Sequence, residues 1–325
     1  MHSKKKIIPL LLLAVGLGAT NAYAAPGDYP VKPIKMIISF PPGGPTDSSI
    51  RIIAEKLGEL MKQTVFIDNK AGAGGNVGTQ LAARAEPDGY TFLASSSAFA
   101  VNPSMYAGKA GYDPIKDFIP VITVTTQPNV ISVNEKVPVK TFAELKELAK
   151  TGKLSFSSPG SGTTPHLTCE NIFRVNWKSD IVHVPYTGAG PASLAVVAGD
   201  TPVACTAAFG VLQFHKQGRV RILGISSDKR LPSLPDVPTF AELGYRDIND
   251  YTWTTIFAPA GTPALIVEKM NQAVNQILAM PEFKEKLDKG GLIPVGGTQQ
   301  ETAAYIASEV KRWSQVVKMT GAKAE

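Results

Sequence analysis

The sequence is poor in cysteine, in clustered charge and in long apolar runs, and each shortage excludes a class of protein. Its two cysteines, Cys169 and Cys205, are too few for a disulfide framework. Sequence alone cannot place them within bonding distance, so a bridge between them stays an open alternative. Lysine and arginine are spread along the chain, which argues against a nucleic-acid partner. After residue 24, no apolar run reaches the ~20 residues that cross a bilayer.

Metal and cofactor motifs are also missing. His166, His183 and His215 are scattered, without companion cysteines or an H-E-x-x-H pair, so we expect no metal site. The glycine-rich residues 71–78 are a loose relative of the dinucleotide fingerprint. The next strand, however, ends in three serines where that fold needs an acid to hold the ribose, so we expect no cofactor.

No catalytic set stands out. The serine in Gly160-Ser161-Gly162 does not lie in a G-x-S-x-G elbow, and neither cysteine is beside an obvious base. We therefore expect a protein that is not an enzyme, and we keep an exported hydrolase built on Ser161 and His166 as the alternative.

The N-terminus has the pattern of a secretory signal peptide. Three lysines precede the apolar run IIPLLLLAVGLGA, and Ala22-Tyr23-Ala24 supplies the small-x-small pattern after which signal peptidase cuts. We expect residues 1–24 to be removed; an uncleaved membrane anchor is disfavoured because the run is too short. Loss of three lysines changes the formal charge from +6 to +3, a modest positive balance that suits an acidic small ligand.

The mature chain of about 300 residues is too long for one ordinary core and predicts two domains. Short β-rich runs alternate with segments whose apolar residues have helical spacing, which predicts parallel, doubly wound α/β sheets. After residue 262 the pattern is almost wholly helical. We expect strands at residues 34–40, 64–69, 90–96, 118–126, 130–134, 154–160, 180–186, 202–207, 220–226 and 253–259. Crossovers near residues 127–129 and 250–253 predict a first domain of residues 25–126 plus 251–325, and an inserted second domain of residues 127–250.

A turn rich in proline and glycine follows the first predicted strand. In SFPPGGPTDSS, residues 39–49, Gly43 and Gly44 lack Cβ atoms and let a ligand approach the main chain, while the prolines stiffen the loop. Thr46, Asp47 or Ser48 is expected to cap the next helix, whose unpaired N–H groups attract anions. A plain strand-to-helix turn is the alternative.

Two later turns have similar chemistry. The third strand ends in Ser95-Ser96-Ser97, and residues 157–167 read SSPGSGTTPHL, in which Pro165 suits a helix start. Ligands of open α/β sheets bind beyond the carboxyl ends of the strands, so these turns are expected to meet at one site. Hydroxyl donors in two domains predict a clamp around a carboxylate.

Six motifs in this order carry a family resemblance: FPPGGPTD, NKAGAGGNVGTQLAARAEPDGYT, SPGSGTTPHL, HVPYTGAGPA, SSDKRLPSLPDVPTFAELGY and FAPAGTP. The mature chain closely resembles the Bug proteins, the extracytoplasmic receptors of tripartite tricarboxylate transporters. The resemblance implies a periplasmic, monomeric solute receptor with a two-domain periplasmic-binding-protein (Venus flytrap, type II) fold and two crossover strands. It also implies delivery to a permease of one large and one small membrane subunit, and no catalysis.

The resemblance further implies a set of ligand-binding positions. They are Phe40, Pro42, Gly43, Gly44, Thr46, Asp47, Ser95, Ser96, Ser97, Ser161, Gly162, Thr163, Thr164, His166, Thr206, Ala207 and Phe209. The chain departs from the family pattern at residues 201–208, where Thr206 replaces an acid and alanines replace bulkier residues. We expect this change to disfavour amino acids and to favour a dicarboxylate, including aromatic ones.

Overall fold

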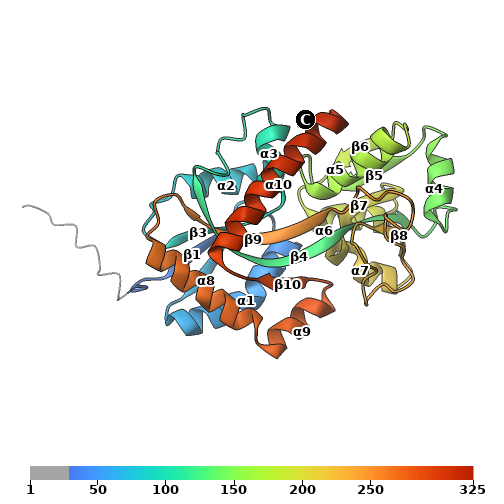
Figure 1. Ribbon diagram of the computed structural model, residues 1–325. Coiled ribbons are helices and arrows are strands. Elements are labelled where there is room, and N and C mark those ends of the chain that lie inside the picture. Colours follow the sequence, from blue (N-terminus) through green and yellow to red (C-terminus); the bar gives the residue numbers. More distant parts are fainter. Residues whose placement is uncertain (1–28, 325) are drawn as a thin grey trace, which may run out of the picture.

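The computed structural model describes residues 29–324 and shows two lobes joined by long strands (Figure 1). The expected signal peptide, residues 1–24, lies outside the described residues. In the described part of the chain, no helix is long and apolar enough to cross a membrane.

The first lobe is built on three parallel strands. β1 (Ile34–Ile38) lies between β2 (Val65–Asn69) and β3 (Thr91–Ser96). The connections carry α1 (Pro45–Met61), the short η1 (Ala73–Gly75), α2 (Asn76–Ala83) and α3 (Ala98–Met105). In α1 the apolar residues at helical spacing, among them Ile50, Ile53 and Leu57, are buried against the sheet, as their period predicts.

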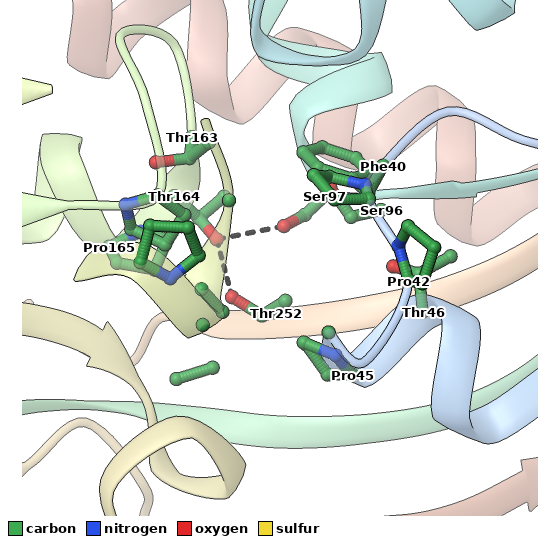
Figure 2. Close-up of a pocket in the computed structure, with 18 residues that line it drawn as sticks. Phe40, Pro42, Pro45, Thr46, Ser96, Ser97, Thr163, Thr164, Pro165 and Thr252 are labelled. Atoms are coloured by element: carbon green, nitrogen blue, oxygen red, sulfur yellow. Dashed lines mark hydrogen bonds between the residues drawn. The ribbon is translucent and has the colours of Figure 1, made fainter. Parts of the chain in front are cut away.

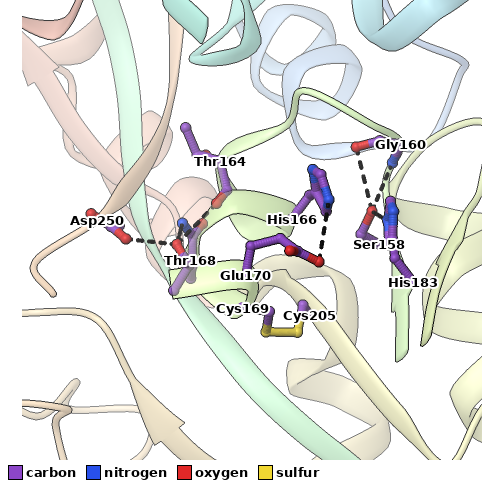
Figure 3. The surroundings of a disulfide bond; sticks show 11 residues. Ser158, Gly160, Thr164, His166, Thr168, Cys169, Glu170, His183, Cys205 and Asp250 are labelled. Atoms are coloured by element: carbon purple, nitrogen blue, oxygen red, sulfur yellow. Dashed lines mark hydrogen bonds and ion pairs between the residues drawn. A yellow bond between two sulfur atoms is a disulfide. The ribbon is translucent and has the colours of Figure 1, made fainter. Parts of the chain in front are cut away.

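The second lobe repeats this plan. β5 (Ser155–Ser158) lies between β6 (Val182–Pro185) and β7 (Val203–Ala207), again in parallel. Its helical elements are α4 (Phe142–Ala149), α5 (Thr164–Glu170), the π-helical η2 (Asn171–Asn176), α6 (Ala189–Ala198) and α7 (Ala208–Lys216). A disulfide between Cys169 and Cys205 joins α5 to β7 (Figure 3), which resolves the alternative that the sequence left open.

Two crossover strands connect the lobes. β4 (Phe118–Asn134) pairs with β9 (Tyr251–Pro259) up to Pro128, and from Asn129 onward it pairs with β7 and with β8 (Val220–Ile225). The sequence predicted two strands here; they are one, because the backbone stays extended through residues 127–129 while its pairing partners change. These crossover pairings are antiparallel, so the sheet is mixed rather than wholly parallel. The domain bounds at 126/127 and 250/251 stay a prediction.

The C-terminal part carries α8 (Ala264–Leu278), α9 (Pro281–Lys289), β10 (Ile293–Gly296) and α10 (Gln299–Thr320). The sequence missed β10, which has only four residues, among them Pro294, and pairs with β4. α10 packs against α3 and β4 and also reaches α5 and η2 of the second lobe. The last helix therefore contacts both lobes.

Candidate functional site

A pocket lies between the two lobes, where the carboxyl ends of the strands meet (Figure 2). It holds about 520 Å³ of empty space, open solvent at its mouth included, within the range of small-molecule sites. Its lining residues are Phe40, Pro41, Pro42, Gly44, Pro45, Thr46, Ser96, Ser97, Pro159, Thr163, Thr164, Pro165, Gly188, Ala189, Gly190, Pro191, Ala207 and Thr252.

The loop after β1 forms one wall and is held in shape by Asp47. The Asp47 carboxylate accepts hydrogen bonds from the Gly43 N–H (2.9 Å), Arg51 Nε (2.8 Å) and Asn69 Nδ2 (2.9 Å). Burial pushes the pKa of Asp47 upward, but these hydrogen bonds outweigh burial and the pKa is lowered overall. The expectation that Thr46, Asp47 or Ser48 caps α1 was wrong: the N-cap is Gly44, with no side-chain cap. Pro45 already occupies the first turn, so the helix begins earlier.

The loop after β5 forms the opposite wall. Thr163 and Thr164 lie at the start of α5 and line the same pocket as Gly44. The hydroxyl of Thr164 is 2.7 Å from that of Ser97 in the first lobe and 2.9 Å from that of Thr252 on β9, as the dashed lines in Figure 2 show. The two loops therefore face each other across the cleft, which is the geometry that a clamp requires.

The pocket has no charged side chain in its lining. Polar character comes instead from hydroxyls and from the starts of α1, α6 and α7, whose N-caps are Gly44, Gly188 and Ala207. The first N–H groups of a helix have no partner within it, and the helix dipole makes this end favourable for an anion. Prolines, alanines and Phe40 supply the apolar remainder. Such a site can hold an organic acid by main-chain donors.

Of the positions that the resemblance implied, the structure brings about half into this lining: Phe40, Pro42, Gly44, Thr46, Ser96, Ser97, Thr163, Thr164 and Ala207. The others lie outside it. The Gly43 N–H and the Asp47 carboxylate bond each other, and Ser95 pairs with Ser39. Ser161 lines a neighbouring cavity, and Thr206 has a buried hydroxyl without a hydrogen-bond partner among the described residues.

Three further positions outside the lining have partners of their own. The Gly162 N–H donates to His166 Nδ1 at 3.4 Å. The Phe209 N–H donates to Gln127 Oε1 at 2.8 Å, and the Phe209 ring packs against the hydrophobic core of the first lobe. We assign all three to support of the loops rather than to direct contact with a ligand.

His166 is buried under the second loop and pairs with the partly buried His183. Its ring stacks on His183 with centroids 4.0 Å apart, and His183 Nε2 lies 2.7 Å from the Ser158 hydroxyl (Figure 3). Burial lowers the pKa of His166 well below its usual value, with smaller effects from His183 and Arg174. Burial also lowers the pKa of His183, to about 4. Both rings are therefore neutral near pH 7 and stabilise the loop by packing. Among residues 29–324, no His, Cys, Asp and Glu cluster could hold a metal ion.

Comparison with known proteins identifies the family and the fold. Residues 49–322 match the family described as "Tripartite tricarboxylate transporter family receptor". The chain belongs to this family. BugT of Bordetella pertussis is 36% identical over 321 residues, which cover 96% of this chain and 98% of BugT.

Solved structures of relatives agree with the family. The periplasmic binding protein BugD has a TM-score of 0.86 at 31% identity, covering 91% of this chain and 100% of its own. Rpa4515 of R. palustris, solved with adipate, has a TM-score of 0.85 at 32% identity, covering 90% and 98%. These likenesses confirm the expected two-domain periplasmic-binding-protein fold and the resemblance to Bug proteins.

The sequence missed one side of the receptor pocket. Residues 188–191, the turn from β6 into α6, line it, although their motif HVPYTGAGPA predicted no contact with a ligand. Gly188 has φ +131°, which favours glycine, and a Cβ there would lie 3.1 Å from Pro41 of the first lobe. Thr252 was also missed, because a hydroxyl within a strand gives no signal until the strand is known to cross the cleft.

Proposed function

We propose that this chain is a periplasmic receptor that captures an organic carboxylate between its lobes. It would then deliver the ligand to the large and small membrane subunits of a tripartite tricarboxylate transporter, after export and cleavage following Ala24. The observation that carries this proposal is the uncharged pocket surrounded by the starts of α1, α6 and α7. A carboxylate suits such an environment because N–H groups and helix dipoles compensate its charge.

The lining favours a C4–C6 dicarboxylate or an aromatic acid such as terephthalate. The pocket has no carboxylate that could pair with an ammonium group, so an amino acid would leave its positive charge uncompensated. Phe40 and the prolines offer apolar contact to a methylene chain or a ring. The relative Rpa4515 was solved with adipate, a C6 dicarboxylate, which supports this class.

The available contacts are sufficient in energy. Micromolar affinity corresponds to about 8 kcal/mol, and a hydrogen bond to a charged group is worth about 1.5 to 3 kcal/mol. A handful of such bonds in a closed cleft therefore suffices after ordering costs. Because both loops must contact the ligand, binding favours the closed arrangement of the lobes.

Calorimetry with purified protein tests this function. We expect adipate, succinate or terephthalate to bind more tightly than aspartate and glutamate, and mass spectrometry to identify a carboxylate released on denaturation. Thr46→Val removes a hydroxyl from the pocket and should weaken binding about fivefold, the effect of one hydrogen bond. Thr302→Val, which removes a buried hydroxyl from the first turn of α10, is the matched control. Tighter binding of the amino acids would contradict the proposed ligand class.

The hydrolase alternative finds no support in the arrangement of its two residues. His166 Nδ1 accepts from the Gly162 N–H, and among the described residues its ring has no hydrogen bond to the Ser161 hydroxyl. Ser161 and His166 also lie outside the lining of the main pocket. Incubation of a bound ester or amide of a carboxylic acid should return the compound unchanged. Release of product that depends on Ser161 would establish an enzyme instead.

A further inference from the structure

A chain of buried hydrogen bonds runs from the pocket to the C-terminal helix. In the pocket, Ser97 and Thr164 are 2.7 Å apart, and Thr164 and Thr252 are 2.9 Å apart. The Thr252 hydroxyl then donates to Asn129 Oδ1 at 2.7 Å. Asn129 Nδ2 donates to the Thr168 hydroxyl at 2.9 Å.

The chain ends at a buried ion pair. The Thr168 hydroxyl donates to Asp250 Oδ2 at 2.8 Å, and the other oxygen of Asp250 pairs with Arg312 of α10. Burial raises the pKa of Asp250 while Arg312 and Thr168 act against it. With a guanidinium in direct contact, we take the carboxylate as ionised near pH 7. Figure 3 shows Asp250 pointing at Thr168.

The carboxylate fixes the direction of every hydrogen bond in the chain. An ionised carboxylate only accepts and is a stronger acceptor than the Thr164 carbonyl oxygen, which lies 2.9 Å from the Thr168 hydroxyl, so the Thr168 proton points to Asp250 and the Thr168 oxygen accepts from Asn129. This orients the amide of Asn129 with its oxygen toward Thr252. In the reverse orientation, the Thr168 hydroxyl would donate its proton to the amide oxygen of Asn129. The Asp250 carboxylate would then face the Thr168 oxygen without a hydrogen between them.

The same constraint reaches the pocket. Thr252 uses its single proton on Asn129, so it accepts from Thr164, and Thr164 in turn accepts from Ser97. The three hydroxyls of this wall therefore have lone pairs left but no free proton. In this arrangement Ser97 and Thr164 offer lone pairs to a ligand, whereas the sequence predicted that they donate to a carboxylate.

We propose that the wall formed by Ser97, Thr164 and Thr252 selects ligands that bring an uncharged hydrogen-bond donor, and that the solute is a hydroxycarboxylate. This inference rests on the proposed function and refines it. The carboxylate lies toward the loop after β1, where the Thr46 hydroxyl has no hydrogen-bond partner among the described residues. The Ser96 hydroxyl, next to Ser97, accepts from the Ala98 N–H and keeps its own proton for the carboxylate. The hydroxyl of the ligand faces the acceptor wall.

Matched pairs of acids that differ by one hydroxyl test the inference. Calorimetry would compare malate with succinate, 3-hydroxyglutarate with glutarate, and 4-hydroxybenzoate with benzoate. In the pair that binds best, we expect the hydroxylated acid to bind about fivefold more tightly, the change for one neutral hydrogen bond. Equal or weaker binding of the hydroxylated acid would overturn the inference while leaving a carboxylate receptor intact. Binding of none of the acids would overturn the proposed function itself.

Variants of β9 separate this wall from general effects. Thr252→Val frees the Thr164 proton. The ratio of the affinities for the hydroxylated and the plain acid should therefore fall to about one. Thr255→Val is the control: its hydroxyl is buried on the same strand, pairs with Thr123 at 2.9 Å and does not line the pocket. The control should keep the preference, and loss of the preference in both variants would refute the role of the wall. If Thr252→Val does not fold, Ser97→Ala removes one acceptor and should also reduce the preference.

Discussion

Replacing Gly74 by alanine would place a methyl group where the rims of the two lobes touch. Gly74 lies in η1 of the first lobe with φ +61°, and its added Cβ would be 2.6 Å from the backbone oxygen of Ser161 in the second lobe. Real Cβ contacts stay above 3.0 Å, so the lobes would have to separate by at least about 0.4 Å. A backbone oxygen in a short loop cannot rotate away as a side chain could.

This steric clash raises the free energy of the closed form, in which the ligand contacts both lobes. Overpacking of this kind costs about 1 to 3 kcal/mol, which corresponds to a loss of affinity of roughly 5-fold to 150-fold. Calorimetry with the acid that the wild type binds measures the loss, and small-angle scattering of the loaded protein should show a less compact particle.

Gly321→Ala controls for backbone strain. Gly321 has a nearly equal backbone conformation, φ +66° and ψ 14° against φ +61° and ψ 26°, but nothing lies within 4 Å of its added Cβ. Each variant should lose about 1 to 2 kcal/mol of stability from the left-handed conformation, and only Gly74→Ala should lose affinity. Unchanged affinity of Gly74→Ala would refute the reasoning, because the bound state would then not need this contact.

Three further predictions concern stability and the loops. Removing the disulfide by Cys169→Ala with Cys205→Ala should cost about 4 kcal/mol in urea unfolding, from the entropy of a loop spanning 36 residues; an equal loss on reducing the wild type would agree, and no loss would contradict it. The Asp47 pKa is lowered, so its stabilisation is present above about pH 4 and is lost as the pH falls through the lower folded-state value. Asp47→Asn should flatten this acid dependence in unfolding curves and weaken carboxylate binding, because an amide offers only one acceptor oxygen to the three donors that hold the loop. The pKa of His183 is lowered to about 4 from an unfolded value near 6.5, so the unfolded state binds more protons between these values. Stability should therefore fall by up to about 3 kcal/mol between pH 6.5 and pH 4, and less in His183→Phe; an equal fall in that variant would contradict the assignment.

The sequence predicts the elements well where one rule decides them. Strand runs and helical spacing gave the strands of both lobes, because burial against a sheet selects apolar residues at a fixed period. The crossover at residues 127–129 was located, but not its continuity as β4, since Pro128 and its neighbours look like a break in isolation. β10 has only four residues and lies within the sequence GGLIPVGG, residues 290–297. This run is too short for the alternation of apolar and polar residues that indicates a strand.

The sequence predicted the site only in those loops whose residue composition differs from that of an ordinary turn. The loops at Gly44 and at Thr163 could be predicted because they combine glycine, proline and hydroxyl-bearing residues. Residues 188–191 contribute main chain and small apolar atoms, which carry no chemical signal of their own. The direction of the hydrogen bonds that begin at Asp250 depends on contacts between residues up to 123 positions apart, such as Thr252 and Asn129, and no local pattern encodes it.

The two buried aspartates near the pocket explain how a neutral cleft can still discriminate. Asp47 uses its charge to set the loop that offers N–H donors, and Asp250 uses its charge to remove the free protons from the opposite wall. Neither carboxylate enters the lining, so neither repels an acidic ligand at close range. The charges therefore decide which wall donates and which wall accepts, while the contacts with the ligand stay uncharged. Because the lining holds no opposite charge, opening of the lobes does not have to break an ion pair with the ligand.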